Sequence, residues 1–328
     1  MAAQGRSLAS FLLNEIEDDH DNERDEIFTL VPIIIDQINE CLPGHRMIDW
    51  VEKVLPHYRD DEFRRHFRLR RASFEKLCCS IADASSFQQT QTGGRPMVPI
   101  QKQVLVYLWY SSSKENLWRI ADRFNITESA THRSIRRVMN AILEKLLKDL
   151  IKWPTGDRLR AVLQGFADMK GLEGACGAID GSHIRISGKE EFKINYINRK
   201  NYPSINLQGV CDHQMLFTDA YAGWPGSVHD ARVFANSDLK QRIVEDQMSL
   251  FPGNTFIIGD AAYRLETYLL TPYKGYGLNA KQTRYNYIHS ASRMVIERAF
   301  GLLKSRFCRL QLVALRTIED IVKLIMTC

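Results

Sequence analysis

Apolar residues recur at helical spacing through the first half of the chain, over about residues 27–150. Within 66–84 the apolar positions fall at steps of 7, 3 and 4, which predicts one face of a helix. These positions are Phe67, Phe74, Leu77 and Ile81. A loop rich in Gln, Thr, Gly and Pro follows over 88–99, and Pro99 is expected to start a new helix.

A helix-turn-helix pattern occupies about residues 117–140. Asn125 is expected to end the first helix, and Thr127 to cap the second. The outward positions of the second helix carry Arg133, Arg136 and Arg137. In a major groove these arginines would reach guanine edges or phosphates. A helical hairpin with a solvated basic face explains the same pattern at least as well.

After Trp153 and Pro154 the pattern changes to short strands separated by turns. Segments rich in Ile, Val, Phe and Tyr predict strands over 175–186, 204–212, 215–223 and 254–263. Helices are expected over 230–245 and 289–307. Three strands in antiparallel order, then a helix, a parallel strand and more helices predict an α/β fold with helices on the faces of a mixed sheet.

Composition and charge narrow the class of protein. The net charge is +5. Residues 1–30 hold eight acidic and two basic residues, so they carry −6 and the rest of the chain +11, which suits a polyanionic partner. The longest apolar run, 104–110, is too short to span a membrane, and acids stand where a secretory cleavage site should lie. We therefore predict an acidic mobile tail over 1–26, a helical region over 27–152 and an α/β domain over 153–328.

The seven cysteines are an odd number, and they are scattered without the spacing of a zinc site. This usage predicts reduced, mostly buried thiols in an intracellular compartment.

Four acids mark a candidate active site. Asp180 lies inside a predicted strand, where an acid costs several kcal/mol unless it is paired or binds a cation. Asp260 ends a strand, at the sheet edge where α/β folds place their chemistry. Asp230 opens a helix, and Glu297 flanks the apolar ridge of another. Hard divalent cations prefer such oxygen ligands, and two of them can promote phosphodiester hydrolysis.

Each acid also has a structural explanation. Asp230 suits a helix N-cap, Glu297 an ion pair with Arg293 four residues earlier, and Asp260 a cap on the next turn. Asp180 is the hardest to explain in this way, because a strand interior offers it no capping role. The spacing alone leaves both interpretations open.

Several ordered segments carry a family resemblance. They are AIDGSHIRI, NYPSINLQGVCD, GWPGSVHDARVF, IIGDAAYRL and YNYIHSASRMVIERAFGLLKSRF. Together with the upstream FRLRRASFEKLC and LWRIADRFNITESATHRSIRRV, they resemble the PIF/Harbinger superfamily of DDE transposases and its domesticated branch, the Harbinger transposase-derived nucleases. The resemblance runs from about residue 60 to 325.

The resemblance implies an RNase H-like catalytic fold preceded by a helical region with a helix-turn-helix. It also implies a DNA endonuclease that depends on Mg²⁺ or Mn²⁺. Asp180, Asp260 and Glu297 match the DDE triad, and Asp230 matches a fourth acid counted with the metal ligands. A Myb-like partner that supplies DNA binding and nuclear import is expected, with localisation in nucleus and cytoplasm and the oligomeric state open.

The end of the chain departs from that family. Relatives continue through a further helix, whereas this sequence stops at IVKLIMTC. This departure keeps a second hypothesis open, a DNA-binding or scaffold protein that no longer cuts. Ribonuclease action on RNA or hybrids is a third hypothesis, which the resemblance disfavours.

Overall fold

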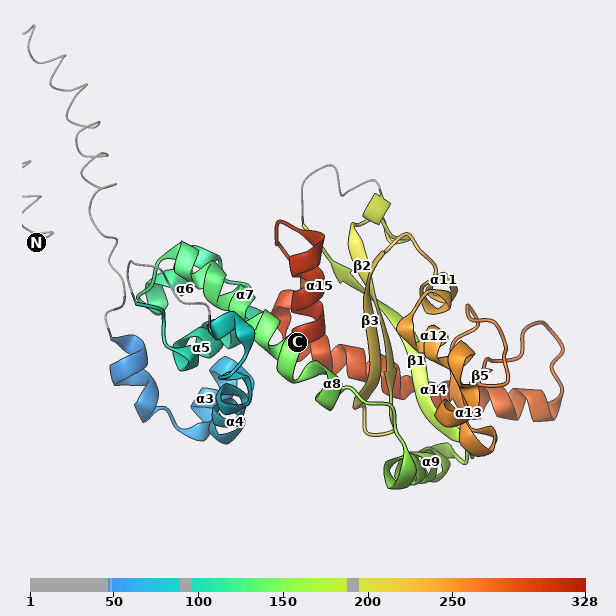
Figure 1. Cartoon of the computed structure of the whole chain (residues 1–328). Helices are drawn as coiled ribbons and strands as arrows, with labels where there is room; N and C mark the ends of the chain where they lie inside the picture. Colours follow the sequence, from blue (N-terminus) through green and yellow to red (C-terminus); the bar gives the residue numbers. More distant parts are fainter. Residues whose placement is uncertain (1–46, 48, 89–95, 188–194) are drawn as a thin grey trace, which may run out of the picture. The chain divides into compact units, whose positions relative to one another are not determined.

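The computed structural model describes residues 47, 49–88, 96–187 and 195–328 of the chain (Figure 1). Residues 48–328 form one compact unit. The predicted acidic tail and Cys41 lie outside the described residues. The six described cysteines are free thiols, and burial raises the pKa of Cys176 to about 12. Among the described helices, none is long and apolar enough to cross a bilayer.

Short helices build the first half of this unit. They are η2 (Trp50–Val54), η3 (Leu55–His57), α3 (Asp60–Phe67), α4 (Arg71–Ile81), η4 (Ser85–Phe87), α5 (Ile100–Ser112), α6 (Leu117–Arg123), α7 (Glu128–Lys145) and α8 (Leu147–Leu150). The helix α5 begins after Pro99 as predicted, and every residue from 103 to 112 is buried. It is therefore the central helix of this region, and the others pack around it.

The single helix predicted over 66–84 is wrong. Arg68 adopts a left-handed conformation, with φ 62°, and separates α3 from α4. The apolar spacing continues across the break because both helices face one aromatic cluster. The Phe63 ring lies 4.7 Å from that of Phe67 and 5.6 Å from that of Phe74.

The two helices of the predicted helix-turn-helix are present as α6 and α7. Asn125 has a positive φ of 49° in the turn, and the Thr127 hydroxyl accepts a hydrogen bond from the Ala130 amide at 3.1 Å. The last helix, α15 (Ile318–Thr327), contacts both α7 and the sheet. Arg136 on α7 places Nε 3.1 Å from the Asp320 carboxylate of α15.

The second half contains a five-stranded mixed sheet (Figure 1). Its strands are β1 (Ala175–Arg185), β2 (Ser204–Cys211), β3 (Phe217–Pro225), β4 (Phe256–Ile258) and β5 (Leu269–Leu270), in the order β3-β2-β1-β4-β5. The first three strands pair antiparallel, and β4 pairs parallel to β1 and β5. The predicted α/β class, a mixed sheet flanked by helices, is confirmed.

The remaining helices cover this sheet. They are α9 (Gly156–Lys170), α11 (Asp230–Ala235), α12 (Asp238–Glu245), α13 (Gln247–Leu250), η5 (Pro252–Asn254), α14 (Ala280–Arg306) and η6 (Cys308–Gln311). The predicted 230–245 helix is split, because the Ser237 hydroxyl accepts a hydrogen bond from the Lys240 amide and starts α12. The long α14 begins earlier than predicted, at a capping box formed by Asn279 and Gln282.

The two faces of the sheet carry different cores. Ala178 and Ile184 of β1 belong to one apolar cluster with Phe300 of α14. Ile179 belongs to another with Phe234 of α11 and Leu239 of α12. Because successive residues of a strand point to opposite faces, α14 and α11 cover opposite sides of β1.

Candidate active site

Asp180 lies on β1 and accepts two hydrogen bonds. The Gly181 amide donates to its Oδ1 at 2.8 Å, and the Arg293 guanidinium donates to its Oδ2 at 2.8 Å. Burial raises the pKa of Asp180 to about 6, and the negative charges of Asp260 and Asp230 add to this, while the Gly181 amide and Arg293 oppose it. The Arg293 guanidinium thus holds the Asp180 carboxylate in place.

Glu297 lies one turn beyond Arg293 on α14. It accepts a hydrogen bond from the second Nη atom of Arg293, so the ion pair anticipated as its structural explanation is present. The same guanidinium also binds Asp180, which is 113 residues away in the sequence. Arg293 therefore bridges two members of the predicted triad, Asp180 and Glu297.

Asp260 follows β4 by two residues. Its Oδ1 accepts a hydrogen bond from the Ala262 amide at 2.9 Å, so its anticipated role in a turn is also present. Its negative charge is one of those that raise the pKa of Asp180. Because the pairing of β4 with β1 ends at Ala178, Asp180 lies on a stretch of β1 that β4 does not cover.

Asp230 reaches β1 from the other face. It is the first residue of α11 and His229 is the N-cap, so the capping explanation for Asp230 is wrong. Asn206 donates a hydrogen bond to its Oδ1 at 2.6 Å, and a Cβ on Gly181 would lie 2.1 Å from the same oxygen. Gly181 and Asp180 point to opposite faces, so Asp230 approaches the strand opposite the Asp180 side chain.

These residues suit a hard cation in their chemistry. Asp180 is a half-buried carboxylate whose pKa is raised by burial and by the charges of two further acids, and oxygen ligands are those that Mg²⁺ and Mn²⁺ prefer. Asp180, Asp260 and Glu297 would hold the ion on the face of α14, with Asp230 on the other face. In the part of the chain that is described, no three His, Cys, Asp or Glu side chains already form a metal-sized cluster. Arg293 supplies the compensating positive charge instead.

Two residues of the site were missed from the sequence. Arg293 was identified only as a partner for Glu297, and nothing local indicated its bond to Asp180. Tyr263 is buried beside the acids, and burial together with Asp230, Asp180 and Asp260 raises its pKa well above the usual value. Its hydroxyl has no hydrogen-bond partner among the described residues.

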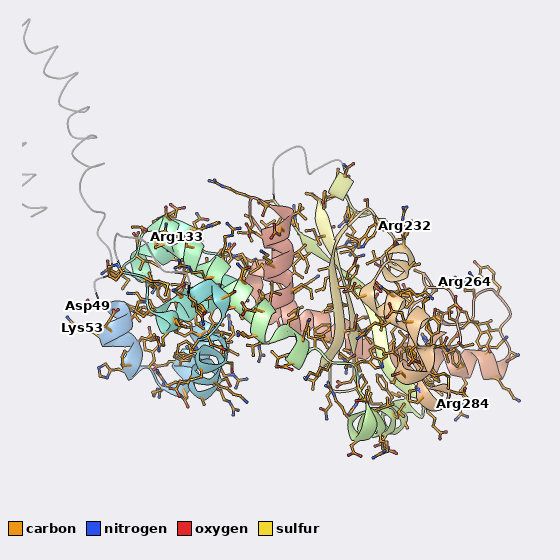
Figure 2. All side chains as sticks on the ribbon, in the orientation of Figure 1. Asp49, Lys53, Arg133, Arg232, Arg264 and Arg284 are labelled. Carbon is orange, nitrogen blue, oxygen red and sulfur yellow. The ribbon has the colours of Figure 1, made fainter. Side chains whose placement is uncertain are left out.

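The three arginines of the predicted DNA-binding helix lie on α7, apart from the acids. Arg133 is exposed (labelled in Figure 2), and Arg137 is half-buried. Arg136 is exposed but lies against Asp320, so part of its charge is neutralised within the protein. Arg133 is therefore the exposed arginine of the three for which no ion pair is seen among the described residues.

Comparison with known proteins finds a family that is similar to the second half of the chain. Residues 179–328 match the family described as DDE superfamily endonuclease. This second half of the chain is therefore similar to a DDE superfamily endonuclease domain. The match extends from β1 to α15, so it contains Asp180, Asp230, Asp260 and Glu297.

Individual relatives point to the same group of proteins. "Putative nuclease HARBI1" of Homo sapiens is 29% identical over 212 residues, which cover 63% of this chain and 58% of that protein. "Protein ALP1-like" of Arabidopsis thaliana is 30% identical over 256 residues, covering 74% and 62%. These relatives confirm the predicted resemblance to Harbinger transposase-derived nucleases. The chain spans about three-fifths of their length, and no solved structure matches it.

Proposed function

We propose that this protein is a metal-dependent DNA endonuclease derived from a Harbinger-type DDE transposase. The observation that supports this function best is the environment of Asp180. This carboxylate is half-buried in a strand, carries a raised pKa to which the charge of Asp260 contributes, and is tied through Arg293 to Glu297. A fold gains nothing in stability from gathering acids in this way, and such clusters of perturbed groups mark functional sites.

The proposed reaction is hydrolysis of a phosphodiester bond with two divalent ions. Bound ions of this kind activate water and stabilise the leaving oxygen. Asp180, Asp260 and Glu297 would hold and orient the ions. Asp230, the fourth acid of the proposed ligand set, approaches β1 from the opposite face, so it would have to shift to reach the same ions. Lys304 donates hydrogen bonds to the Ser182 hydroxyl at 2.8 Å and to the His183 carbonyl at 2.9 Å, which fixes α14, and with it Glu297, against β1.

Nicking of supercoiled plasmid DNA with Mg²⁺ or Mn²⁺ tests this function. We expect Asp180→Asn and Glu297→Gln to lower the rate roughly 100-fold or more, because each removes a ligand charge. Asp238→Asn is the matched control, since Asp238 is an exposed acid at the start of α12. Nicking that persists unchanged in both site variants would exclude these acids as the active site.

A second function is a DNA-binding or scaffold protein that does not cut. The pairing of Arg293 with two triad acids favours it, because an internal cation already neutralises the site. This alternative predicts salt-sensitive DNA binding without nicking in either metal. Competition between DNA and an RNA–DNA hybrid separates both functions from ribonuclease action.

We also propose that α7 contacts DNA through Arg133, Arg136 and Arg137. Their outward position on the second helix of a helix-turn-helix supports this proposal. The Myb-like partner, an oligomeric state and localisation in nucleus and cytoplasm stay predictions from the family resemblance.

A further inference from the structure

A cavity of about 580 Å³ lies next to the acids, and the proposed function does not use it. Three tyrosines and two cations line it: Tyr263, Tyr273, Tyr285, Arg264 and Lys274. We call this site the tyrosine pocket. Its volume falls within the range of about 300–1,000 Å³ that small-molecule sites occupy.

The tyrosine pocket adjoins the active site through Tyr263. The Tyr263 amide donates a hydrogen bond to the Asp260 carbonyl at 3.3 Å. The charges of Asp230, Asp180 and Asp260 all act on its phenol, which is only 2% exposed. One wall of the pocket is thus shared with the acid cluster, so a group bound in the pocket would lie beside the reacting bond.

Hydrogen bonds hold the opposite wall in a defined shape. Tyr285 on α14 donates its hydroxyl to the Thr271 carbonyl at 3.3 Å. Asn286 accepts a hydrogen bond from the Tyr273 amide at 2.8 Å and donates one to the Tyr273 carbonyl at 3.0 Å. The segment after β5 is therefore fastened to α14, and the pocket is formed before any ligand arrives.

The aromatic rings of the pocket leave room for a planar ligand. Tyr273 and Tyr285 meet edge to face, with ring centroids 5.4 Å apart and an interplanar angle of 79°. In such a pair one ring offers only an edge to the other, so its own faces stay available for stacking. Tyr273 is 52% exposed, so a base could approach its ring from solvent.

Two of the lining residues are cations. The Arg264 side chain is 90% exposed, with its Nε 3.6 Å from Glu266, and Lys274 is exposed in the following loop. Lys281 and Arg284 add positive charge near the start of α14. Figure 2 shows Arg264 and Arg284 on the side of the catalytic region where α14 begins. Aromatic faces combined with a basic rim match the two parts of a nucleotide, its base and its phosphate.

We propose that the tyrosine pocket binds one unpaired nucleotide of the DNA strand, next to the bond that is cut. The base stacks on Tyr273 and Tyr285, and the adjoining phosphates lie against Arg264 and Lys274. A fully paired duplex cannot place a base there without unstacking it, so the pocket favours DNA with unpaired or easily opened positions. The choice of DNA as ligand rests on the proposed function.

Binding of fluorescently labelled DNA in EDTA tests this inference without cleavage. The probes are a forked duplex with unpaired ends and a fully paired duplex of the same sequence. We expect the wild-type protein to prefer the forked duplex, and Tyr273→Ala to weaken that binding roughly tenfold while leaving the paired duplex unchanged. Arg264→Ala is expected to weaken binding and to lower its salt dependence.

Tyr276→Ala is the matched control. Tyr276 lies in the same loop and is fully exposed, but it does not line the pocket. A wild-type protein without preference for the forked duplex would overturn the proposal, as would equal effects of Tyr273→Ala and Tyr276→Ala. Loss of both probes to the same extent in Tyr273→Ala would overturn it too.

A second readout reports stacking directly. With 2-aminopurine at the unpaired position, the wild-type protein should change its fluorescence, and Tyr273→Ala should abolish that change. The plasmid-nicking assay separates the two proposals. A wild-type protein that binds forked DNA selectively but never nicks refutes the endonuclease and leaves the pocket standing, whereas nicking without selective binding does the reverse.

Discussion

Removal of the Arg293 guanidinium tests whether this cation stabilises the neighbouring carboxylates. In Arg293→Met the half-buried Asp180 carboxylate loses its counter-ion while the charges of Asp260 and Asp230 continue to disfavour its ionised form. Breaking a buried ion pair by removing one partner costs about 3–5 kcal/mol. The Arg293 and Asp180 side chains are 19% and 18% exposed, and Glu297 is 50% exposed. Solvent screening therefore reduces the expected loss to about 2 kcal/mol at pH 7.5.

The loss should depend on pH with a definite sign. The folded pKa of Asp180 is raised to about 6 with Arg293 in place, and it rises further without it. Below that pKa the carboxyl is neutral in the folded state, so no charge is left without compensation. We therefore expect Arg293→Met to cost much less at pH 5 than at pH 7.5. Urea denaturation at both values measures this difference.

Two further variants make the test specific. Arg298→Met removes an exposed guanidinium from the same helix and should change the free energy of unfolding by less than about 0.5 kcal/mol. Asp180→Asn combined with Arg293→Met should be more stable than Arg293→Met alone, because the uncompensated charge is gone. Equal losses at pH 5 and 7.5, or an equal loss in Arg298→Met, would refute the role of Arg293 as counter-ion.

Three other predictions concern acids, packing and DNA. Burial raises the pKa of Asp219 to about 6, so its contribution to stability is present below pH 4 and lost as the pH rises through 6. Asp219→Asn should therefore remove up to about 3 kcal/mol of pH dependence in urea denaturation, and an unchanged profile would contradict this. Gly181→Ala should displace Asp230, because the new Cβ would lie 2.1 Å from the Asp230 Oδ1 atom. The free energy of unfolding in urea should fall by about 1–3 kcal/mol. Wild-type stability in this variant would disprove the close approach. Arg133→Ala should lower DNA affinity in anisotropy titrations and reduce the slope of log affinity against log salt concentration by about 1. Arg232 is exposed and lies outside α7, so Arg232→Ala should change neither. Equal slopes in the two variants would argue against groove binding by α7.

Local patterns in the sequence predicted most of the fold. The first four strands, the start of α5 after Pro99 and the Thr127 cap of α7 were all predicted, because alternation and capping depend on neighbouring residues. The strand β5 was missed, since two residues are too short to show alternation. The break at Arg68 was missed because one aromatic cluster keeps the apolar spacing intact across it.

The candidate acids were also predictable, because an acid inside an apolar strand is anomalous on local grounds and Asp180 is such an acid. The sequence by itself thus determined the strands, most helices and which acids required an explanation. Only the tertiary structure joined Asp180 to Glu297 through Arg293, put Asp230 on the opposite face of β1, and assembled a pocket from Tyr263, Tyr273 and Tyr285. The reason is physical: these distances depend on strand order and on how α14 and α11 pack against the sheet, and no local pattern encodes either.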